Sequence, residues 1–468
     1  MYVEETLYLT VRELADRIRA GAMSPVELTQ SYLERAGRLG PRWNAFARLT
    51  AEMALQDARA AQQEIRAGHY RGPLHGIPFA VKDLLAVRGA PTTWGAKPYA
   101  SQTFDHDATV VVRLRQAGAV LLGKAAMIEL AGGMGYRFAS ASLTGAAKNP
   151  WNTGCWTCGS SSGSGAIVAG ALAAFAIGTE TWGSIICPAA FCGITGLRPT
   201  YGRVSRHGGM VLCSSLDKIG PLARSAGDCG LVLAAIAGHD PLDSSSLPAV
   251  DAAFTWPVTS RPARVLRFGW VAEQMKDAQP GVAAAADAAR KVLEKAGCKV
   301  TEAKLPQGPW EPAASVIIAV EGAAAFDDMI SSGRCLGLTD PSGQVGGFVG
   351  QQMSGSDYLR AQRVRRVLQQ KMAGIFREYD ILISASQSFT ATKLDANLET
   401  DLSAPDPLGA IGNLCGLPAV SVPCGFDANG LPVGLQFLGA PMADSTVLAA
   451  ADAYQRLSDW HRRHPPAS

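Results

Sequence analysis

The chain has 468 residues, of which 47% are hydrophobic, and its 43 basic residues nearly balance 40 acidic ones. A chain this long and apolar can bury a large core, and a formal net charge of +3 gives it no electrostatic reason to bind nucleic acid. No uninterrupted apolar run reaches membrane-spanning length, and the charged start MYVEETLYLT has no signal-peptide core, so we expect a cytoplasmic protein without a membrane partner.

Helix-start signals open the chain. Thr10 with Glu13, and Ser24 with Glu27, have the three-residue spacing of capping boxes, and each pair precedes a helical pattern. The Ala-rich segment 52–66 predicts a third helix.

Strand and helix patterns then alternate. The pattern predicts a strand in FAVKD near residue 79, a helix in TVVVRLRQAG at 109–118 and a strand in AVLLGKA at 119–125. Further strands are expected in RVLRFGWVA, KVTEAKL, YDILISAS, AVSVPCGF and PVGLQFLG, and a further helix at 282–296. This alternation predicts an α/β fold, with a large mixed sheet covered by helices on both faces.

The stretch 158–206 is unusually dense in glycine and serine, which favours an active site. Gly159, Gly163 and Gly165 come just before AIVAGALAAFAI, which predicts one tightly packed helix. Free backbone N–H groups and the positive end of the helix dipole favour an oxyanion, or a nucleophile that is losing its proton, at such a helix start.

Four other interpretations of this stretch remain open. A phosphate-binding loop needs Lys and then Ser or Thr, where Ala166 and Ile167 stand. A dinucleotide site could use Glu180, but no clear strand precedes the loop. GSSSG matches a nucleophile elbow with Ser161, whose base would come from the downstream histidines His207, His239, His461 or His464. The segment could also be a simple Gly/Ser-rich turn.

Two other features favour nucleophilic catalysis. Ser184 follows Trp182 and Gly183 at a turn where successive N–H groups can converge on one oxygen. Lys82 lies in an apolar strand, where burial would lower its pKa and leave a neutral amine able to act as a base. The alternative is that Lys82 only pairs with the adjacent Asp83.

Together these motifs resemble the amidase signature family. The resemblance rests on GIPFAVKD, NPWN, GSSSGSGAIVAG, GTETWGSIICPAAFCGITGLRPTYGRVSRHG and NLCGLPAVSVPCGFDANGLPVGLQFLG, which follow the family's order between about residues 8 and 456. It implies Ser184 as nucleophile, Ser160 as the bridging serine and Lys82 as base. It also implies a cis peptide bond from Gly159 to Ser160.

The same resemblance implies an oxyanion hole made by the backbone N–H groups of Thr181, Trp182, Gly183 and Ser184. Substrate-binding residues are expected at Met134, Gly135, Tyr136 and Trp182. Because the resemblance places Trp182 where the family usually has Gly, close to the nucleophile, we expect the indole to shape the pocket.

There are two further departures from the family pattern. Ser162 replaces a usual Gly at little cost. Glu180 and Ile186 replace a usual Asp and Arg, which removes an expected ion pair and leaves the partner of Glu180 to be found.

The resemblance implies one domain over residues 1–468. Its parts are a helical start (1–67), a catalytic core (68–240), a Pro/Ser/Asp-rich connector (241–265), a substrate-covering region (266–375) and C-terminal core strands with a helix (376–468). Within the substrate-covering region, SSGRCLGLTDPSGQVGGFVGQQMSGSD is expected to be a mobile loop.

We expect an amidohydrolase that cleaves linear, neutral aryl or alkyl amides through an acyl-enzyme, with carbamates (urethanes) and esters as additional substrates. It would work as a monomer or homodimer with no metal and no cofactor. One alternative is the glutamine-hydrolysing A subunit of a glutamyl-tRNA amidotransferase, for which Arg334 offers a carboxylate clamp. The other is a non-enzymatic phosphate-binding module.

The ten cysteines lie mostly in apolar or glycine-rich stretches, which predicts reduced thiols in the core. Only Cys155 and Cys158 form a C-x-x-C pair, and no second pair or histidine cluster accompanies them. The pair therefore predicts neither a zinc site nor a redox role.

Overall fold

The computed structural model describes residues 2–257, 262–401 and 404–466. Within these ranges, eleven strands form one mixed sheet and two short strands form another. In spatial order the large sheet contains β1 (Phe46–Leu49), β3 (Val120–Ala125), β2 (Pro78–Lys82), β6 (Phe175–Glu180), β8 (Lys218–Ala223), β7 (Thr195–Arg198), β12 (Ala419–Phe426), β13 (Pro432–Gly439), β11 (Ile381–Ala385), β9 (Arg267–Trp270) and β10 (Lys299–Glu302). The small sheet pairs β4 (Lys148–Asn149) with β5 (Asn152–Trp156).

Parallel strands lie toward the two ends of the large sheet, and antiparallel pairs fill its middle. β3, β2 and β6 run parallel to one another, as do β11, β9 and β10. From β6 through β8, β7, β12 and β13 to β11, each adjacent pair of strands is antiparallel. Every residue of β2 is buried, as expected of a strand covered on both faces.

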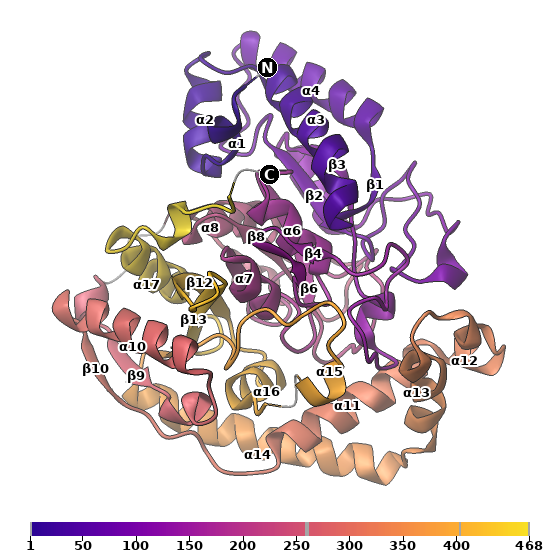
Figure 1. The fold of residues 1–468 in the computed structure, drawn as a ribbon, viewed down its shortest axis with the longest axis vertical. Helices are drawn as coiled ribbons and strands as arrows, with labels where there is room; N and C mark the ends of the chain where they lie inside the picture. The colour runs from indigo at the N-terminus through magenta and orange to yellow at the C-terminus, as the bar shows by residue number, and fades with distance from the viewer. Residues whose placement is uncertain (1, 258–261, 402–403, 467–468) are drawn as a thin grey trace.

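Helices surround this sheet (Figure 1). The α-helices are α1 (Glu4–Leu7), α2 (Val11–Arg19), α3 (Pro25–Trp43), α4 (Ala51–Arg66), α5 (Thr109–Gln116), α6 (Ser162–Ala169), α7 (Ile186–Cys192), α8 (Ala226–Ile236), α9 (Ala249–Ala252), α10 (Pro280–Lys295), α11 (Trp310–Ala325), α12 (Asp327–Ser331), α13 (Pro341–Gln352), α14 (Gly355–Glu378), α15 (Leu398–Asp401), α16 (Pro407–Leu414) and α17 (Asp444–Arg456). Short 3₁₀ helices are η1 (Lys97–Tyr99), η2 (Glu129–Gly132), η3 (Ala263–Val265), η4 (Ala272–Met275), η5 (Arg334–Gly337) and η6 (Trp460–Arg462).

Neighbouring residues of β7 show that helices cover both faces of the sheet. The Thr195 side chain accepts a hydrogen bond from Gln455 of α17, whereas a Cβ on Gly196 would meet Ala189 of α7. Since successive residues of a strand point to opposite faces, α17 and α7 lie on opposite sides of the sheet. The expected α/β fold, with its large mixed sheet covered on both faces, is confirmed.

The helix starts expected near the N-terminus are present. Thr10 and Glu13 form a reciprocal capping box on α2. On α3, the Ser24 side chain accepts the Glu27 N–H and Pro25 stands at the first helical position, but the Ser24 N–H donates to the Tyr2 hydroxyl and not to Glu27, so the second expected capping box is only half formed. In Figure 1 these indigo helices lie at the end of the molecule where β1, β2 and β3 lie, while α14 runs along the opposite end.

The prediction that AIVAGALAAFAI forms one helix was wrong. Helix α6 ends at Ala169, and β6 begins at Phe175. At the helix end, a Cβ on Gly170 would lie 2.1 Å from the Trp43 ring, so the close packing of Trp43 requires glycine there. An Ala-rich sequence hides this boundary, because it suits a packed helix as well as a buried strand.

The prediction of a mobile loop over residues 331–357 was also wrong, because that segment is largely helical. Asp340 accepts the Ser342 N–H as the N-cap of α13, and Pro341 takes the first helical position. The helix glycines allow close contact: a Cβ on Gly346 would lie 1.9 Å from the Met134 carbonyl oxygen. The Asp-Pro pair is the sequence signal that could have revealed this helix.

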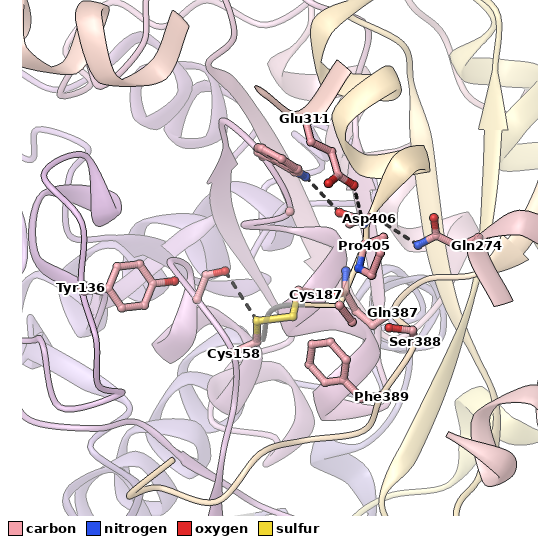
Figure 2. A pocket seen from close by; sticks show the side chains of 14 residues that line it. Tyr136, Cys158, Cys187, Gln274, Glu311, Gln387, Ser388, Phe389, Pro405 and Asp406 are labelled. Carbon is pink, nitrogen blue, oxygen red and sulfur yellow. Dashed lines mark hydrogen bonds between the residues drawn. A yellow bond between two sulfur atoms is a disulfide. The ribbon is translucent and has the colours of Figure 1, made fainter. Parts of the chain in front are cut away.

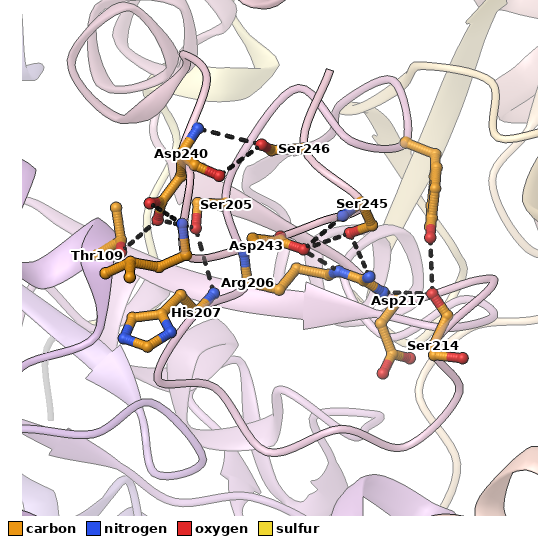
Figure 3. A network of polar contacts seen from close by, with 12 residues as sticks. Thr109, Ser205, Arg206, His207, Ser214, Asp217, Asp240, Asp243, Ser245 and Ser246 are labelled. Atoms are coloured by element: carbon orange, nitrogen blue, oxygen red, sulfur yellow. Dashed lines mark hydrogen bonds and ion pairs between the residues drawn. The ribbon is translucent and has the colours of Figure 1, made fainter. Parts of the chain in front are cut away.

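The connector of residues 241–265 is tied to the core where the structure describes it; residues 258–261 lie outside the described ranges. Figure 3 shows the ties. Within the connector, Asp243 accepts the Arg206 N–H at 2.8 Å and Ser246 donates to the Asp240 carbonyl at 2.9 Å. Asp240, directly before the connector, accepts hydrogen bonds from Thr109 and Ser205 at 2.6 and 2.5 Å. Across the described residues, no helix is both long and apolar enough to cross a membrane.

Candidate active site

Lys82, Ser160 and Ser184 form one chain of hydrogen bonds. Lys82 Nζ lies 2.7 Å from Ser160 Oγ, and Ser160 Oγ donates to Ser184 Oγ at 3.1 Å. Lys82 Nζ also bonds Thr179 Oγ1 at 3.0 Å. The peptide bond between Gly159 and Ser160 is cis. The three residues that the sequence suggested as a triad are thus brought together.

The topology of the sheet explains this meeting. Lys82 is the last residue of β2, and Ser184 follows β6, the parallel neighbour of β2. Ser160 lies just before α6, which packs against both strands. Because the carboxyl ends of adjacent parallel strands meet at one edge of a sheet, the residues that follow them share one site.

Lys82 lies in an environment that favours its neutral form. Its side chain is fully buried, and this burial lowers its pKa to about 7, although Asp217 and Glu180 nearby oppose the shift. Asp83 faces the other way and pairs with Lys124 at 2.9 Å. The alternative that Lys82 only pairs with Asp83 therefore does not hold.

The turn between β6 and α7 presents backbone donors beside Ser184. Gly183 has φ +82°, and a Cβ there would meet no atom within 4 Å, so the turn is open on that side. Within the described residues, the N–H groups of Trp182, Gly183 and Ser184 donate no hydrogen bond to the protein. Thr181 anchors the turn through its hydroxyl, which donates to Asp217 Oδ1 at 2.6 Å.

Glu180 finds its partner in Arg198. The two buried side chains pair at 2.7 Å, and Asn413 donates a further hydrogen bond to the carboxylate. The other carboxylate oxygen accepts the N–H groups of Ile185 and Ile186 at 2.9 and 3.0 Å. Burial alone would raise the pKa of Glu180, but the charge of Arg198 and these donors hold it at about 2. An ionised carboxylate thus fixes the turn that carries Ser184.

The geometry does not support two other interpretations of the serine-rich stretch, the nucleophile elbow and the dinucleotide site. Ser161 exchanges hydrogen bonds with the backbone of Thr179, and among the described residues no histidine reaches it. A strand, β5, does precede Gly159, contrary to expectation, but it lies outside the main sheet, paired with β4 and bridged at Cys155 to Lys393. A nucleophile elbow needs a histidine base within reach of its serine, and a dinucleotide loop needs to follow a strand of the main sheet. The described residues show neither arrangement.

A cavity of about 330 Å³ lies beside this site (Figure 2). Its lining residues come from distant parts of the chain: Tyr136, Cys158, Gly159, Trp182, Gly183, Cys187, Gln274, Glu311, Gln387, Ser388, Phe389, Ala404, Pro405 and Asp406. Two of the four expected substrate-binding residues, Tyr136 and Trp182, are among them. Met134 and Gly135 lie outside this lining, and Arg334 lies against the Tyr99 ring instead.

An acidic wall, Glu311 and Asp406, was missed by sequence reasoning. The Trp182 indole N–H donates to Asp406 Oδ2 at 3.0 Å, and Gln274 donates to Asp406 Oδ1 at 3.0 Å. Glu311 in turn accepts the Asp406 N–H at 2.7 Å. Burial raises the pKa of Asp406. These residues have no shared motif, so only the fold reveals that they meet.

The expectation that all ten cysteines are reduced thiols was wrong. Cys158 and Cys187 form a disulfide with a Cα–Cα distance of 6.0 Å, although 29 positions separate them. They meet because Cys158 precedes the serine loop and Cys187 lies in the first turn of the helix after Ser184, and the fold joins these two segments at the cavity. Cys155, the other half of the C-x-x-C pair, is a buried free thiol.

Comparison with known proteins identifies the family. The family model described as Amidase matches residues 27–448. The chain belongs to the amidase signature family. Its general reaction class is therefore the hydrolysis of an amide C–N bond.

The relatives of this amidase include both amidotransferase subunits and peptide amidases. The A subunit of the glutamyl-tRNA(Gln) amidotransferase of Chromohalobacter salexigens is 40% identical, with 97% of this chain and 98% of the relative aligned. The native peptide amidase of Stenotrophomonas maltophilia is 31% identical, with a TM-score of 0.85 and 98% of each chain covered. A third relative is a solved chain from work on a vestigial protein complex and the evolutionary origins of an s-triazine catabolic enzyme. It is 32% identical, has a TM-score of 0.87, and the match covers 96% of this amidase and 98% of that chain.

Proposed function

We propose that the protein hydrolyses neutral amides through a covalent acyl-enzyme on Ser184. The observation that carries this proposal is the continuous chain from Lys82 through Ser160 to Ser184, which ends beside an open cavity. Carbamates and esters, whose carbonyl carbon is attacked in the same way, belong to the same proposal.

The first half-reaction begins with neutral Lys82. Ser184 gives its proton to Ser160, which passes its own proton to the Lys82 amine, while Ser184 Oγ attacks the substrate carbonyl. The oxygen that becomes negative is held by N–H groups of the turn at Thr181, Trp182, Gly183 and Ser184. Collapse of this intermediate breaks the C–N bond, and the proton on Lys82 returns through Ser160 to the leaving amine.

The second half-reaction repeats these steps with water. A water molecule attacks the acyl-enzyme carbonyl and gives its proton by the same relay to Lys82. Breakdown of the second tetrahedral intermediate releases the acid and returns a proton to Ser184 Oγ. Because the pKa of Lys82 is about 7, the amine can accept and return protons near neutral pH.

The lining of the cavity supports neutral substrates. Among the described residues that line it, none is Lys, Arg or His, whereas Glu311 and Asp406 are acidic. A substrate that carries a carboxylate would meet acidic groups without a compensating cation. The indole of Trp182 and the ring of Tyr136 offer apolar surface for an aryl or alkyl group.

Glutamine hydrolysis within an amidotransferase complex is the second candidate. It is favoured by the curated relatives, since the chain is 40% identical to the A subunit of one such enzyme over nearly its whole length. The comparisons thus favour this second candidate, whereas the cavity lining favours the first. Action without tRNA or partner subunits is part of the first candidate only. The family match leaves a non-enzymatic phosphate-binding module without support.

A substrate panel on the isolated chain distinguishes the two candidates. It contains an anilide, a small aliphatic amide, a carbamate, an ester and free glutamine. We expect turnover of the neutral amides and no release of ammonia from glutamine. Glutamine turnover that exceeds amide turnover, or that appears only when partner subunits are added, would assign the second candidate.

A further inference from the structure

The Cys158–Cys187 disulfide joins the two segments that carry the serines of the site. Cys158 stands two residues before Ser160, and Cys187 stands three residues after Ser184. Both cysteines line the cavity beside these serines and are only 5% exposed. Figure 2 shows the disulfide in the cavity wall, between Tyr136 on one side and Gln387 and Phe389 on the other.

The two serine segments also meet away from the reactive atoms, where Ser161 exchanges hydrogen bonds with the backbone of Thr179 in β6. Closer to Ser160 and Ser184, each segment has its own anchor. The Ser160 carbonyl accepts the Ile128 N–H at 3.2 Å, whereas the Ser184 turn is held by Glu180 through Ile185 and Ile186. Between the reactive side chains themselves there is one hydrogen bond, from Ser160 to Ser184. Acylation weakens this link, because an acylated Ser184 has no proton to donate and its ester oxygen accepts a hydrogen bond less strongly than a hydroxyl. The disulfide persists through every step of the cycle.

We propose that Cys158 and Cys187 are positioning residues, whose disulfide keeps Ser160 opposite Ser184 while protons and the acyl group move. This inference rests on the proposed function. It makes the disulfide part of the catalytic alignment rather than a general stabiliser, so its loss lowers turnover even in a fully folded chain.

Reduction by a dithiol opens the link. One thiolate of the reagent attacks a disulfide sulfur, the S–S bond breaks, and the second thiolate releases the mixed disulfide. Two electrons and two protons pass to the protein as two cysteine thiols, and the reagent becomes a cyclic disulfide. The reagent reaches the sulfurs through the cavity that they line.

The test compares oxidised and dithiothreitol-treated protein below the unfolding midpoint of both forms. Mass spectrometry after thiol alkylation counts the two new thiols. We expect kcat to fall about tenfold or more while KM changes little, because a misplacement of roughly 1 Å can cost about 10²-fold. Labelling of Ser184 by a serine-directed phosphonate should slow in the same proportion, and reoxidation with diamide should restore both rates.

Variants supply the controls. The double variant C158S/C187S should have the low kcat of the reduced protein and no response to dithiothreitol. C155S removes a neighbouring buried thiol outside the disulfide and should keep both the full rate and the response. If the double variant does not fold, the reversible reduction of the natural chain still decides the question.

Failure of this inference is distinct from failure of the proposed function. Oxidised protein that hydrolyses no amide contradicts the proposed function. Oxidised protein that hydrolyses amides, and keeps its kcat and labelling rate after both new thiols are counted, overturns only the positioning role of the disulfide.

Discussion

The reactive side and the substrate-facing side of the site are built in different ways. Ser160 and Ser184 are 24 positions apart and lie in one glycine- and serine-rich stretch next to two parallel strands. The facing wall joins Trp182 to Asp406, which are 224 positions apart, and Asp406 to Gln274, which are 132 apart. The reactive side thus joins segments that each carry a recognisable motif, although Lys82 lies 78 positions before Ser160, whereas the facing wall joins distant segments that share no motif.

Loss of the base on the reactive side should have the largest effect among the residues that surround Ser184. Lys82→Arg keeps the positive charge and cannot accept the proton, so kcat/KM should fall about 10³-fold, within the usual range for a general base. In the natural chain, only the neutral amine accepts a proton, so activity should rise as pH increases through about 7 and level off above it.

The measurement is a pH–rate profile for both proteins with one neutral anilide. An Arg variant that retains most of the activity, or a natural chain whose rate does not increase between about pH 6 and 8, the range around the lysine pKa, would show that Lys82 is structural. Circular dichroism of the variant checks that its fold is intact.

Loss of the Glu180 carboxylate, which holds the turn that carries Ser184, should have an intermediate effect on kcat. Glu180→Gln weakens the hydrogen bonds from the Ile185 and Ile186 N–H groups and leaves Arg198 without a carboxylate partner. The free energy of unfolding should therefore fall by about 3–5 kcal/mol. The turn at Ser184 should then shift, and kcat should fall about tenfold at temperatures where the variant is folded.

Glu321→Gln is the control, because Glu321, although only partly buried, is likewise a carboxylate that accepts several hydrogen bonds, including those of Ser215 and Tyr358. This control should lose stability but keep its kcat. Thermal unfolding and steady-state kinetics test both variants. Equal losses of kcat in the two would remove the special role of Glu180.

A change on the substrate-facing side should have the smallest effect and should alter selectivity. Trp182→Gly removes an aromatic surface worth about 0.5–1.5 kcal/mol, so the ratio of kcat/KM for an anilide over a small aliphatic amide should drop about three- to tenfold. Trp182→Phe keeps a ring but loses the hydrogen bond to Asp406, so it separates the two contributions. If kcat/KM changes by the same factor for both substrates, Trp182 contributes only to packing.

The sequence predicted that Lys82, Ser160 and Ser184 lie together, chiefly because their motifs resemble those of the amidase signature family, and local signals agree with this placement. Lys82 stands in an apolar strand, and the serines stand in loops next to predicted elements. The sequence could not predict Arg198 as the partner of Glu180, the acidic wall or the Cys158–Cys187 disulfide, because each depends on the packing of separate segments. The helix over residues 341–352 is a different case, because Asp340 and Pro341 are a local helix-start signal, and only its glycines are explained by contacts with Met134 and other distant residues.

The central claim is that Ser184 forms the acyl-enzyme, and covalent labelling tests it most directly. The protein is inactivated with a serine-directed phosphonate, digested and mapped by mass spectrometry, beside a Ser184→Ala variant. We predict one adduct, on Ser184, none in the variant, and a loss of kcat of at least about 10³-fold in a folded variant. An adduct on Ser161, or hydrolysis that persists without Ser184, would contradict the account.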